Sequence, residues 1–299
     1  MVAVGSRSLE RAQVFAAEFG VERSYGSYES LVADGGVDAI YVASPHSEHH
    51  DHALLALGGG KPVLVEKAFT RNAAEAATLI ETAQARVLLV VEAMWTRFLP
   101  HIDVVRRCLE DDLLGEVIAV EADHGQLLYP DGPRRLADPA LAGGALLDLA
   151  IYPISFAHLV LGEFTAVQAT GTLAETGVDA SETVAVIGPQ GAIGTLSSTM
   201  LAKTPCVAAI SGTAARLEID GWFYQPNTVR LLDLTDREID RYESPSREHG
   251  LAYEAAEFAR LLGDGKTESD LLPLNETLRI MRVLDEVRAQ LGVSFPNEE

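Results

Sequence analysis

Apolar runs alternate with amphipathic segments along the first 95 residues. Runs typical of buried strands occupy 2–4, 37–43, 62–65 and 87–91. Helices are predicted between them over 8–20, 27–33, 47–57 and 72–85, with Ser8, Ser47 and Asn72 as caps and Glu75 completing a capping box. Strands and helices that alternate at this spacing predict βαβ units and a parallel sheet.

The pattern changes from about residue 96. A helix over 100–110 and a strand over 117–122 are followed by a helix around Asp148 and then by β-rich runs at 167–173, 182–187, 192–200, 207–212, 215–220 and 228–234. Short turns between consecutive strands predict an antiparallel sheet, and two helices over 251–262 and 275–291 close the chain. We predict a dinucleotide-binding α/β domain over 1–95 and an α+β domain over 96–299, with the last helix packing back on the first domain.

Composition narrows the class of protein. The net charge of −21 disfavours nucleic acid as a partner. Cys108 and Cys206 lie far apart, which is typical of free thiols in a reducing cytosol. No apolar run approaches the roughly 20 residues that span a bilayer, and no secretory signal opens the chain. We expect a cytoplasmic protein without a membrane segment.

A charged pair, Glu66-Lys67, ends the apolar run at 62–65. The ligand crevice of an open α/β sheet lies outside the carboxyl ends of its strands. A lysine fixed there can assist proton transfer or hold a substrate oxygen. The alternative is a surface ion pair at a strand–loop junction, which is common.

Ser6 and Arg7 follow the first apolar run, where a dinucleotide-binding sheet reads the adenosine ribose. An acid at this position favours NAD, whereas arginine accommodates the 2′-phosphate of NADP. The pair therefore indicates NADP, with NAD as the second possibility. The alternative for Arg7 is a solvated side chain at the start of a helix.

A glycine-rich phosphate turn is missing, because no GxGxxG occurs in the sequence. In the strand order 3-2-1-4-5-6 the strand before that turn is central, and its loss leaves two rows of unpaired backbone groups. We expect that residues 1–299 lack a first βα unit of roughly 30 residues.

Four ordered motifs resemble those of the Gfo/Idh/MocA family of NAD(P)-dependent oxidoreductases. They are Ser44-Pro45 with His49 and His52-Ala53, then Glu66-Lys67, then the segment 92–98 and finally 143–148 with Tyr152. The resemblance runs from Val2 nearly to the end of the chain. It implies a Rossmann domain, a second domain with a large antiparallel sheet, and a homodimer formed through that sheet.

Tyr152 stands where most of the family has histidine, four residues after Asp148. This variant resembles the branch that contains dimeric dihydrodiol dehydrogenase and NADP-dependent xylose dehydrogenase. The branch implies a sugar or a cyclic diol as substrate. Ala68 also departs from the family, which has proline there, so we expect a trans Lys67–Ala68 bond.

The spacing of Asp148 and Tyr152 predicts that both lie on one face of a helix. We expect Tyr152 to act as the base, Lys67 to lower its pKa and hold the substrate oxygen, and Asp148 to orient substrate or base. The alternative for Tyr152 is a core tyrosine with a satisfied hydroxyl. The resemblance also implies a set of cofactor-binding residues, which are Ser6, Arg7, Ser44, Pro45, His46, His49, Glu66, Lys67, Trp95 and Arg97. For Trp95 and Arg97 the alternative is interdomain packing.

The histidines at 46, 49, 50 and 52 raise the question of a metal site. No acid–cysteine set completes a tetrahedral site, so we expect no metal. Two further functions stay open beside the oxidoreductase. One is a catalytically inactive family member that binds or regulates, and the other, which has the least support, is a metal hydrolase.

Overall fold

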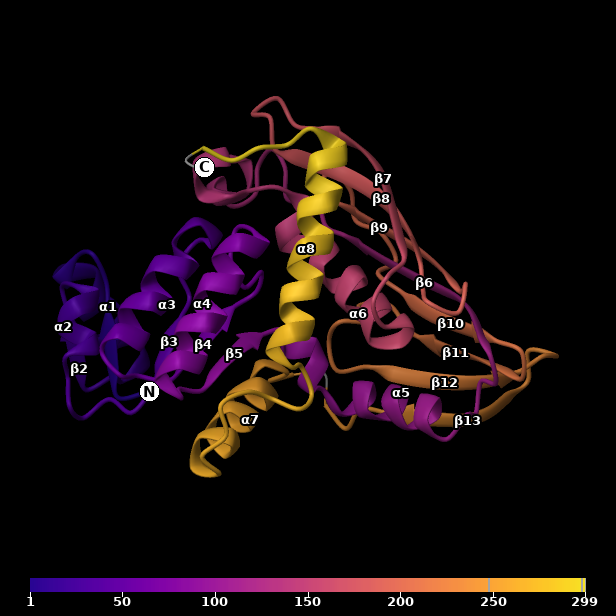
Figure 1. Ribbon diagram of the computed structural model, residues 1–299, viewed down its shortest axis with the longest axis horizontal. Coiled ribbons are helices and arrows are strands. Elements are labelled where there is room, and N and C mark those ends of the chain that lie inside the picture. The colour runs from indigo at the N-terminus through magenta and orange to yellow at the C-terminus, as the bar shows by residue number, and fades with distance from the viewer. Residues whose placement is uncertain (247, 297, 299) are drawn as a thin grey trace.

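The computed structural model describes residues 1–246, 248–296 and 298 (Figure 1). Short strands alternate with helices in its amino-terminal part. The elements are β1 (Ala3–Gly5), α1 (Leu9–Phe19), β2 (Arg23–Tyr25), α2 (Tyr28–Val32), β3 (Ile40–Val42), η1 (His46–Glu48), α3 (His49–Gly58), β4 (Val63–Glu66), α4 (Ala73–Arg86) and β5 (Val90–Ala93). The strand β2 was not predicted.

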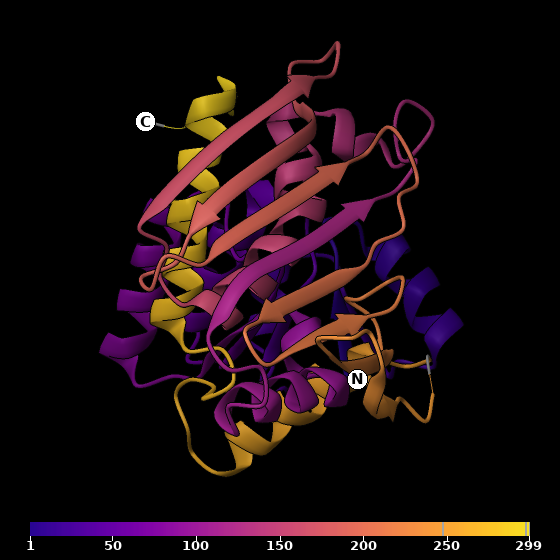
Figure 2. The same ribbon diagram turned by 90° about the vertical axis from the view of Figure 1, so that its right-hand side faces the viewer.

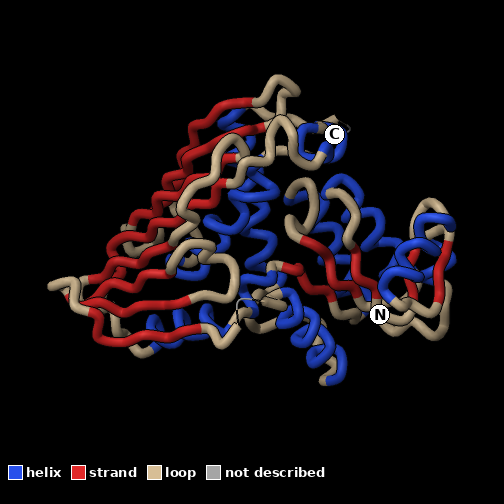
Figure 3. Tube along the Cα trace, turned by 180° about the vertical axis from the view of Figure 1, so that it is seen from behind, coloured by secondary structure: helices blue, strands red, loops and turns tan. Residues whose placement is uncertain are grey.

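These strands form two parallel ladders, which Figure 3 shows from behind. β1 pairs with β2, with Val4 opposite Ser24. β3 pairs with β4 and β4 with β5, with Leu64 opposite both Tyr41 and Val91. β1 and β3 are not hydrogen-bonded to each other. The predicted Rossmann-type parallel sheet is confirmed, and it is divided into two parts.

Side-chain caps begin three of these helices. Ser8 accepts a hydrogen bond from the Arg11 amide, Ser27 caps α2, and Asn72 accepts from the Glu75 amide at 2.9 Å. The predicted cap at Ser47 is wrong. A 3₁₀ turn, η1, comes first, and α3 begins after Glu48 without a side-chain cap.

The second part of the chain begins after β5. Its elements are η2 (Trp95–Phe98), α5 (Pro100–Glu110), β6 (Val117–Gly125), η3 (Arg134–Ala137), η4 (Pro139–Leu141), η5 (Leu146–Ala150), α6 (Ile151–Leu161), β7 (Ala166–Leu173), β8 (Asp179–Ile187), β9 (Ile193–Thr199), β10 (Ala208–Gly212), β11 (Ala215–Ile219), β12 (Thr228–Asp233), β13 (Glu238–Glu243), α7 (Leu251–Gly263) and α8 (Leu274–Leu291). The edge strand β13 was not predicted.

The strands of this part form one eight-stranded sheet in the order β13-β12-β11-β10-β6-β9-β8-β7 (Figure 2). Every neighbouring pair is antiparallel except β6 and β9, which run parallel. Residues alternate between buried and exposed along β8 and β9, as a sheet with one covered face requires. The helix α6 packs on the covered face. The predicted large, mostly antiparallel sheet is confirmed.

Helix α8 contacts both parts of the molecule (Figure 1). The Asp285 carboxylate accepts a hydrogen bond from the Ala73 amide at the start of α4, at 2.8 Å. Five residues further along, Gln290 accepts a hydrogen bond from the Ala169 amide on β7, at 2.7 Å. The helix therefore holds the parallel strands and the large sheet in a fixed relation.

One helical run, Pro139–Leu161, is long and apolar enough to cross a membrane by length and composition. This corrects our prediction that no such run exists. The run belongs to the core, because 89% of its most apolar window is buried inside the protein. Buried helices of large domains are hydrophobic all round for the same reason.

Candidate active site

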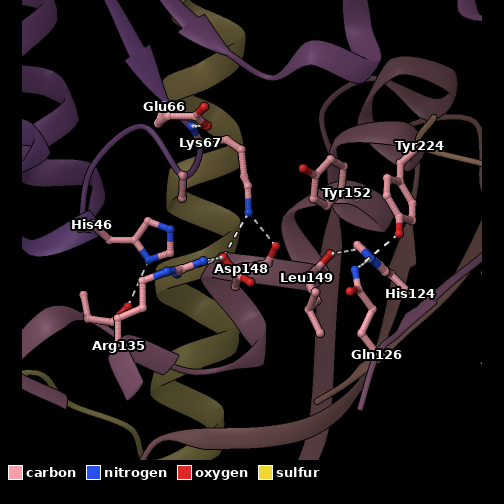
Figure 4. Close-up of polar contacts among 12 residues, drawn as sticks. His46, Glu66, Lys67, His124, Gln126, Arg135, Asp148, Leu149, Tyr152 and Tyr224 are labelled. Atoms are coloured by element: carbon pink, nitrogen blue, oxygen red, sulfur yellow. Dashed lines mark hydrogen bonds and ion pairs between the residues drawn. The ribbon is translucent and has the colours of Figure 1, made fainter. Parts of the chain in front are cut away.

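Lys67 lies at the carboxyl end of β4 and extends toward the second part of the chain (Figure 4). Its Nζ donates to the backbone oxygen of Asp148 at 2.7 Å and to Asp148 Oδ1 at 3.1 Å. Arg135, on the opposite side, donates to the same Oδ1 from both terminal nitrogens, each at 3.1 Å. Lys67 is therefore no surface partner of Glu66, since it forms a buried ion pair across the two parts of the molecule.

Asp148 is positioned by a π-helical segment, η5, which leads directly into α6. The Leu146 amide at its start donates to the buried carboxylate of Asp179 on β8. Gly144 has φ of +116°, and a Cβ there would lie 2.2 Å from Asp179 Oδ1, so only glycine fits. Asp148 and Tyr152 are thus not one turn apart on a regular α-helix, as the spacing predicted. Asp148 lies within the π-helical segment and Tyr152 at the start of the α-helix that follows it, and π-helical turns occur frequently at functional sites.

Lys67 and Asp148 each stabilise the charged form of the other. Burial lowers the pKa of Lys67, but the Asp148 carboxylate raises it by more, and the net shift is upward. Burial raises the pKa of Asp148, but Lys67, His46 and Arg135 together hold it well below its usual range. Both groups are therefore charged at neutral pH, and Lys67 remains a hydrogen-bond donor.

The Tyr152 hydroxyl accepts a hydrogen bond from Trp95 Nε1 at 2.9 Å. Lys67 Nζ lies 5.1 Å from the centre of the Tyr152 ring. Burial raises the pKa of Tyr152, while Lys67 and the Trp95 bond lower it, and burial wins. The predicted downward shift of the Tyr152 pKa is therefore wrong in its net direction, because burial cannot be read from the sequence. The predicted influence of Lys67 has the expected sign.

Three side chains that the sequence did not single out complete one wall of the site (Figure 4). His124 stacks on Tyr224 at 4.1 Å between ring centres and meets Tyr152 edge-on at 5.0 Å. Gln126 contacts both His124 Nε2 and the Tyr224 hydroxyl, at 2.9 and 3.2 Å. Burial lowers the pKa of His124 to about 4, so its imidazole is neutral. His124 and Gln126 come from the end of β6, and no local motif marks them.

Glu66 accepts a hydrogen bond from the Tyr41 hydroxyl and a second from the Lys67 amide. The bond between Lys67 and Ala68 is cis, which corrects the expected trans form. That expectation weighed only the missing proline. Ala68 is fully buried, and its carbonyl accepts from His49 Nδ1 at 2.8 Å, so tertiary contacts surround this peptide.

The histidines bind protein groups. His49 Nε2 contacts the Ser44 carbonyl at 2.8 Å, His46 Nδ1 contacts the Ala142 carbonyl at 3.1 Å, and His52 Nδ1 contacts Ser44 Oγ at 2.9 Å. Burial lowers the pKa of His46 to about 3. Over residues 1–246, 248–296 and 298, no group of three or more histidine, cysteine or acidic side chains is arranged to hold a metal. Ser44 and Pro45 lie between β3 and η1, at the same sheet edge as Lys67.

Arg97 does not lie in the site. Its side chain is 2% exposed, and it donates to the Ser155 carbonyl at 2.9 Å and to the Glu276 carboxylate. These contacts favour the alternative of interdomain packing for Arg97 over its assignment to the cofactor. Residues two apart in the turn η2 point in different directions, so Trp95 reaches Tyr152 while Arg97 enters the core.

Arg7 is exposed at the carboxyl end of β1, directly after Ser6. Burial lowers the pKa of His52 on α3, and the nearby positive charge of Arg7 lowers it further. Arg7 and the Ser44 loop thus flank the same edge of the divided sheet, where a dinucleotide is bound in sheets of this kind.

Comparisons with known proteins agree with this architecture. Residues 1–93 match the family described as "Oxidoreductase family, NAD-binding Rossmann fold", and residues 102–219 match the GFO/IDH/MocA C-terminal domain. A trans-1,2-dihydrobenzene-1,2-diol dehydrogenase of Bos taurus is 34% identical over 307 residues, which cover 100% of this chain and 91% of the relative. A D-xylose 1-dehydrogenase (NADP⁺) of Hypocrea jecorina is 37% identical over 305 residues, covering 92% of this chain and 78% of the relative.

A solved structure gives the same result for the fold. A 3-ketoreductase from Actinomadura kijaniata, in complex with NADP and TDP-benzene, superposes with a TM-score of 0.84 at 26% sequence identity. The superposition covers 97% of this chain and 89% of the other. The chain belongs to the Gfo/Idh/MocA family of oxidoreductases. Its relatives include dehydrogenases of diols and sugars.

Proposed function

We propose that this protein transfers a hydride between NADP and a CH–OH carbon of a sugar or cyclic diol. The observation that carries the proposal is the buried Lys67 ammonium, 3.1 Å from Asp148 Oδ1 and 5.1 Å from the Tyr152 ring centre. Relatives named for a diol and for xylose support the substrate class.

The residues along the sheet edge fit the two ends of a dinucleotide. Arg7, an exposed cation, suits the 2′-phosphate of NADP, and NAD is the second choice. Ser44, Pro45, His46 and His49 would line the middle, with Glu66, Lys67 and Trp95 at the nicotinamide end. When bound, the nicotinamide supplies the hydride acceptor for alcohol oxidation.

Three residues would take part in removing the proton from the substrate hydroxyl. Tyr152 would take the proton of the substrate hydroxyl, and Lys67 would hold the substrate oxygen. Asp148 would keep Lys67 charged and aimed at that oxygen, since its carboxylate raises the pKa of Lys67. The Trp95 hydrogen bond stabilises the phenolate of Tyr152, which offsets part of the upward pKa shift that burial causes.

The substitution Tyr152→Phe tests this role. It removes the hydroxyl but keeps the ring, so we expect unchanged NADPH binding and a turnover lower by about 10²–10⁴-fold, the usual contribution of a positioned acid or base. Tyr253→Phe, on the exposed face of α7, is the matched control. Near-normal turnover of the Tyr152 variant would exclude Tyr152 as the base.

A binding protein without turnover is the second candidate, favoured by the lack of a GxGxxG turn in residues 1–299. NADPH and NADH titrations followed by nicotinamide fluorescence separate the two. Tight NADPH binding with turnover of sugars or diols supports the enzyme, whereas no binding by the native protein supports the second candidate.

We propose further that the protein is a cytoplasmic homodimer formed through the open face of the large sheet. Exposed side chains there are uncharged along three strands, which supports a subunit contact. They are Gln168 and Thr170 on β7, Thr183, Ala185 and Ile187 on β8, and Ile193 and Thr195 on β9. A monomer by light scattering at micromolar concentration would contradict the dimer.

A further inference from the structure

His124 on β6 makes two hydrogen bonds whose directions are fixed. Its Nδ1 lies 3.2 Å from the Leu149 carbonyl oxygen, and a carbonyl oxygen only accepts, so Nδ1 carries the ring proton. The imidazole is neutral, because burial lowers its pKa to about 4. A neutral imidazole has a single N–H, so its Nε2 is an acceptor. His124 therefore presents a lone pair to the side chain beside Nε2.

That side chain is Gln126, which follows directly after β6. Its amide nitrogen lies 2.9 Å from His124 Nε2, and it also donates to the Tyr224 hydroxyl oxygen at 3.2 Å. An amide nitrogen has two protons, so these two contacts use both of them. The amide of Gln126 cannot be turned over, since its oxygen would then face the lone pair of His124.

The Tyr224 hydroxyl is consequently an acceptor toward Gln126, and its own proton is directed elsewhere. Burial raises the pKa of Tyr224, which the Gln225 side chain only partly offsets, so the hydroxyl keeps its proton at neutral pH. Among the described residues, no protein group accepts this proton, and none donates to the Gln126 side-chain oxygen. Gln126 is partly exposed, so this donor and this acceptor are available to a ligand.

The unused donor and acceptor lie beside the proposed proton-handling residues. The Tyr224 ring centre is 5.0 Å from that of Tyr152 and 6.3 Å from that of Trp95. Figure 4 shows His124, Gln126 and Tyr224 on the Tyr152 side of the site, opposite His46 and Arg135. A substrate whose reacting oxygen is held by Lys67 would therefore meet this wall with its neighbouring substituent.

We propose that Tyr224 and Gln126 form a subsite for a second hydroxyl group of the substrate, next to the one that is oxidised. The inference rests on the proposed hydride transfer and narrows its substrates to alcohols with vicinal hydroxyls. The Tyr224 hydroxyl would donate to the oxygen of the second group, and the Gln126 oxygen would accept its proton. This pair matches a hydroxyl, which both donates and accepts. Tyr224 and Gln126 would thus determine specificity and take no part in the proton transfer.

Two matched pairs of alcohols test the subsite in the presence of NADP. They are D-xylose against its analogue without the hydroxyl on the second carbon, and vicinal trans-cyclohexanediol against cyclohexanol. A polar subsite left unpaired penalises the analogue, so kcat/KM of the native protein should favour the vicinal member by at least about 100-fold. Tyr224→Phe keeps the ring and removes the donor, so this preference should fall at least about 10-fold, with the loss confined to the vicinal member. Tyr242→Phe, on β13, is the control and should retain the preference.

Gln126→Glu tests the direction of the hydrogen bonds with the Tyr224 hydroxyl in place. A carboxylate only accepts, so the Tyr224 proton should turn to the new side chain and be lost to the substrate. The preference should therefore fall as it does in Tyr224→Phe. Fluorescence titration should find NADPH binding unchanged in both variants, which shows that they are folded.

Three results would decide against the subsite. A preference that both variants retain would overturn it and leave the proposed reaction standing. An equal loss on both members of a pair would give Tyr224 and Gln126 a structural role only. If the native protein binds NADPH but oxidises neither pair, the proposed reaction on these substrates falls, and the subsite falls with it.

Discussion

Replacing Glu276 by glutamine should destabilise the protein in a pH-dependent way. The Glu276 carboxylate on α8 binds the buried guanidinium of Arg97 and contacts His158 Nδ1 at 3.0 Å. Burial raises the pKa of Glu276, but His158 and Arg97 outweigh it and hold the pKa at about 2, against an ordinary value of 4.5. The ionised form is therefore favoured in the folded protein.

The magnitude follows from this shift. The folded pKa lies about 2.5 units below the ordinary value, and each unit corresponds to about 1.4 kcal/mol, so the ionised carboxylate contributes roughly 3 kcal/mol to the free energy of unfolding. The side chain is only 20% exposed, so solvent screening removes little of it. The figure agrees with the cost of about 3–5 kcal/mol for breaking comparable buried pairs, because loss of the charge leaves Arg97 buried without its anion.

Urea unfolding at several pH values measures the effect. Because the folded pKa is depressed, the contribution is complete above pH 4.5 and is lost as the pH falls toward 2. Glu276→Gln should be less stable than the native protein by about 3 kcal/mol at pH 7, and the difference should shrink as the pH falls through this window. Glu286→Gln, an exposed substitution on the same helix, is the control. A difference below about 0.5 kcal/mol at pH 7, or one that does not change with pH, would refute the reasoning.

Three further substitutions test the site. Trp95→Phe removes a hydrogen bond that lowers the pKa of Tyr152, so the rising, acid-side limb of the pH profile of kcat/KM for alcohol oxidation should move up by about one unit. Arg7→Ser should weaken NADPH binding at least about 10-fold and leave NADH binding unchanged, whereas Arg11→Ser should alter neither in fluorescence titrations. Arg135→Ala removes a half-exposed ion pair, so turnover should fall by no more than about fivefold, and a larger loss would give Arg135 a direct part in the reaction.

The periodic pattern of apolar residues was sufficient to predict most of the helices and strands. The helix predicted over 100–110 has those bounds in the structure, and the β-rich runs all became strands. Two strands, β2 and β13, were not predicted, and each has a physical reason. β2 consists of three half-buried residues, too few to show a period, and β13 is an exposed, charged edge strand that offers no apolar alternation.

The candidate site was predictable where its residues belong to motifs. Lys67, Asp148 and Tyr152 are brought together as the resemblance implied, although their roles stay predictions. His124 and Tyr224 were missed, because a wall built from the end of one strand and a distant loop leaves no local pattern. Directions of pKa shifts were also out of reach, since they depend on burial and on charged partners that lie far apart in the sequence.

The wall formed by His124, Gln126 and Tyr224 has a consequence for how such proteins diversify. The proton-handling residues sit at the end of β4, on η5 and on the first turn of α6, whereas this wall is carried by the end of β6 and the loop before β12. Mutations in the wall can reshape which alcohol is accepted while the Lys67–Asp148 pair stays intact. New substrate preferences can therefore arise from substitutions at strand ends of the large sheet, while the residues that handle the proton stay unchanged.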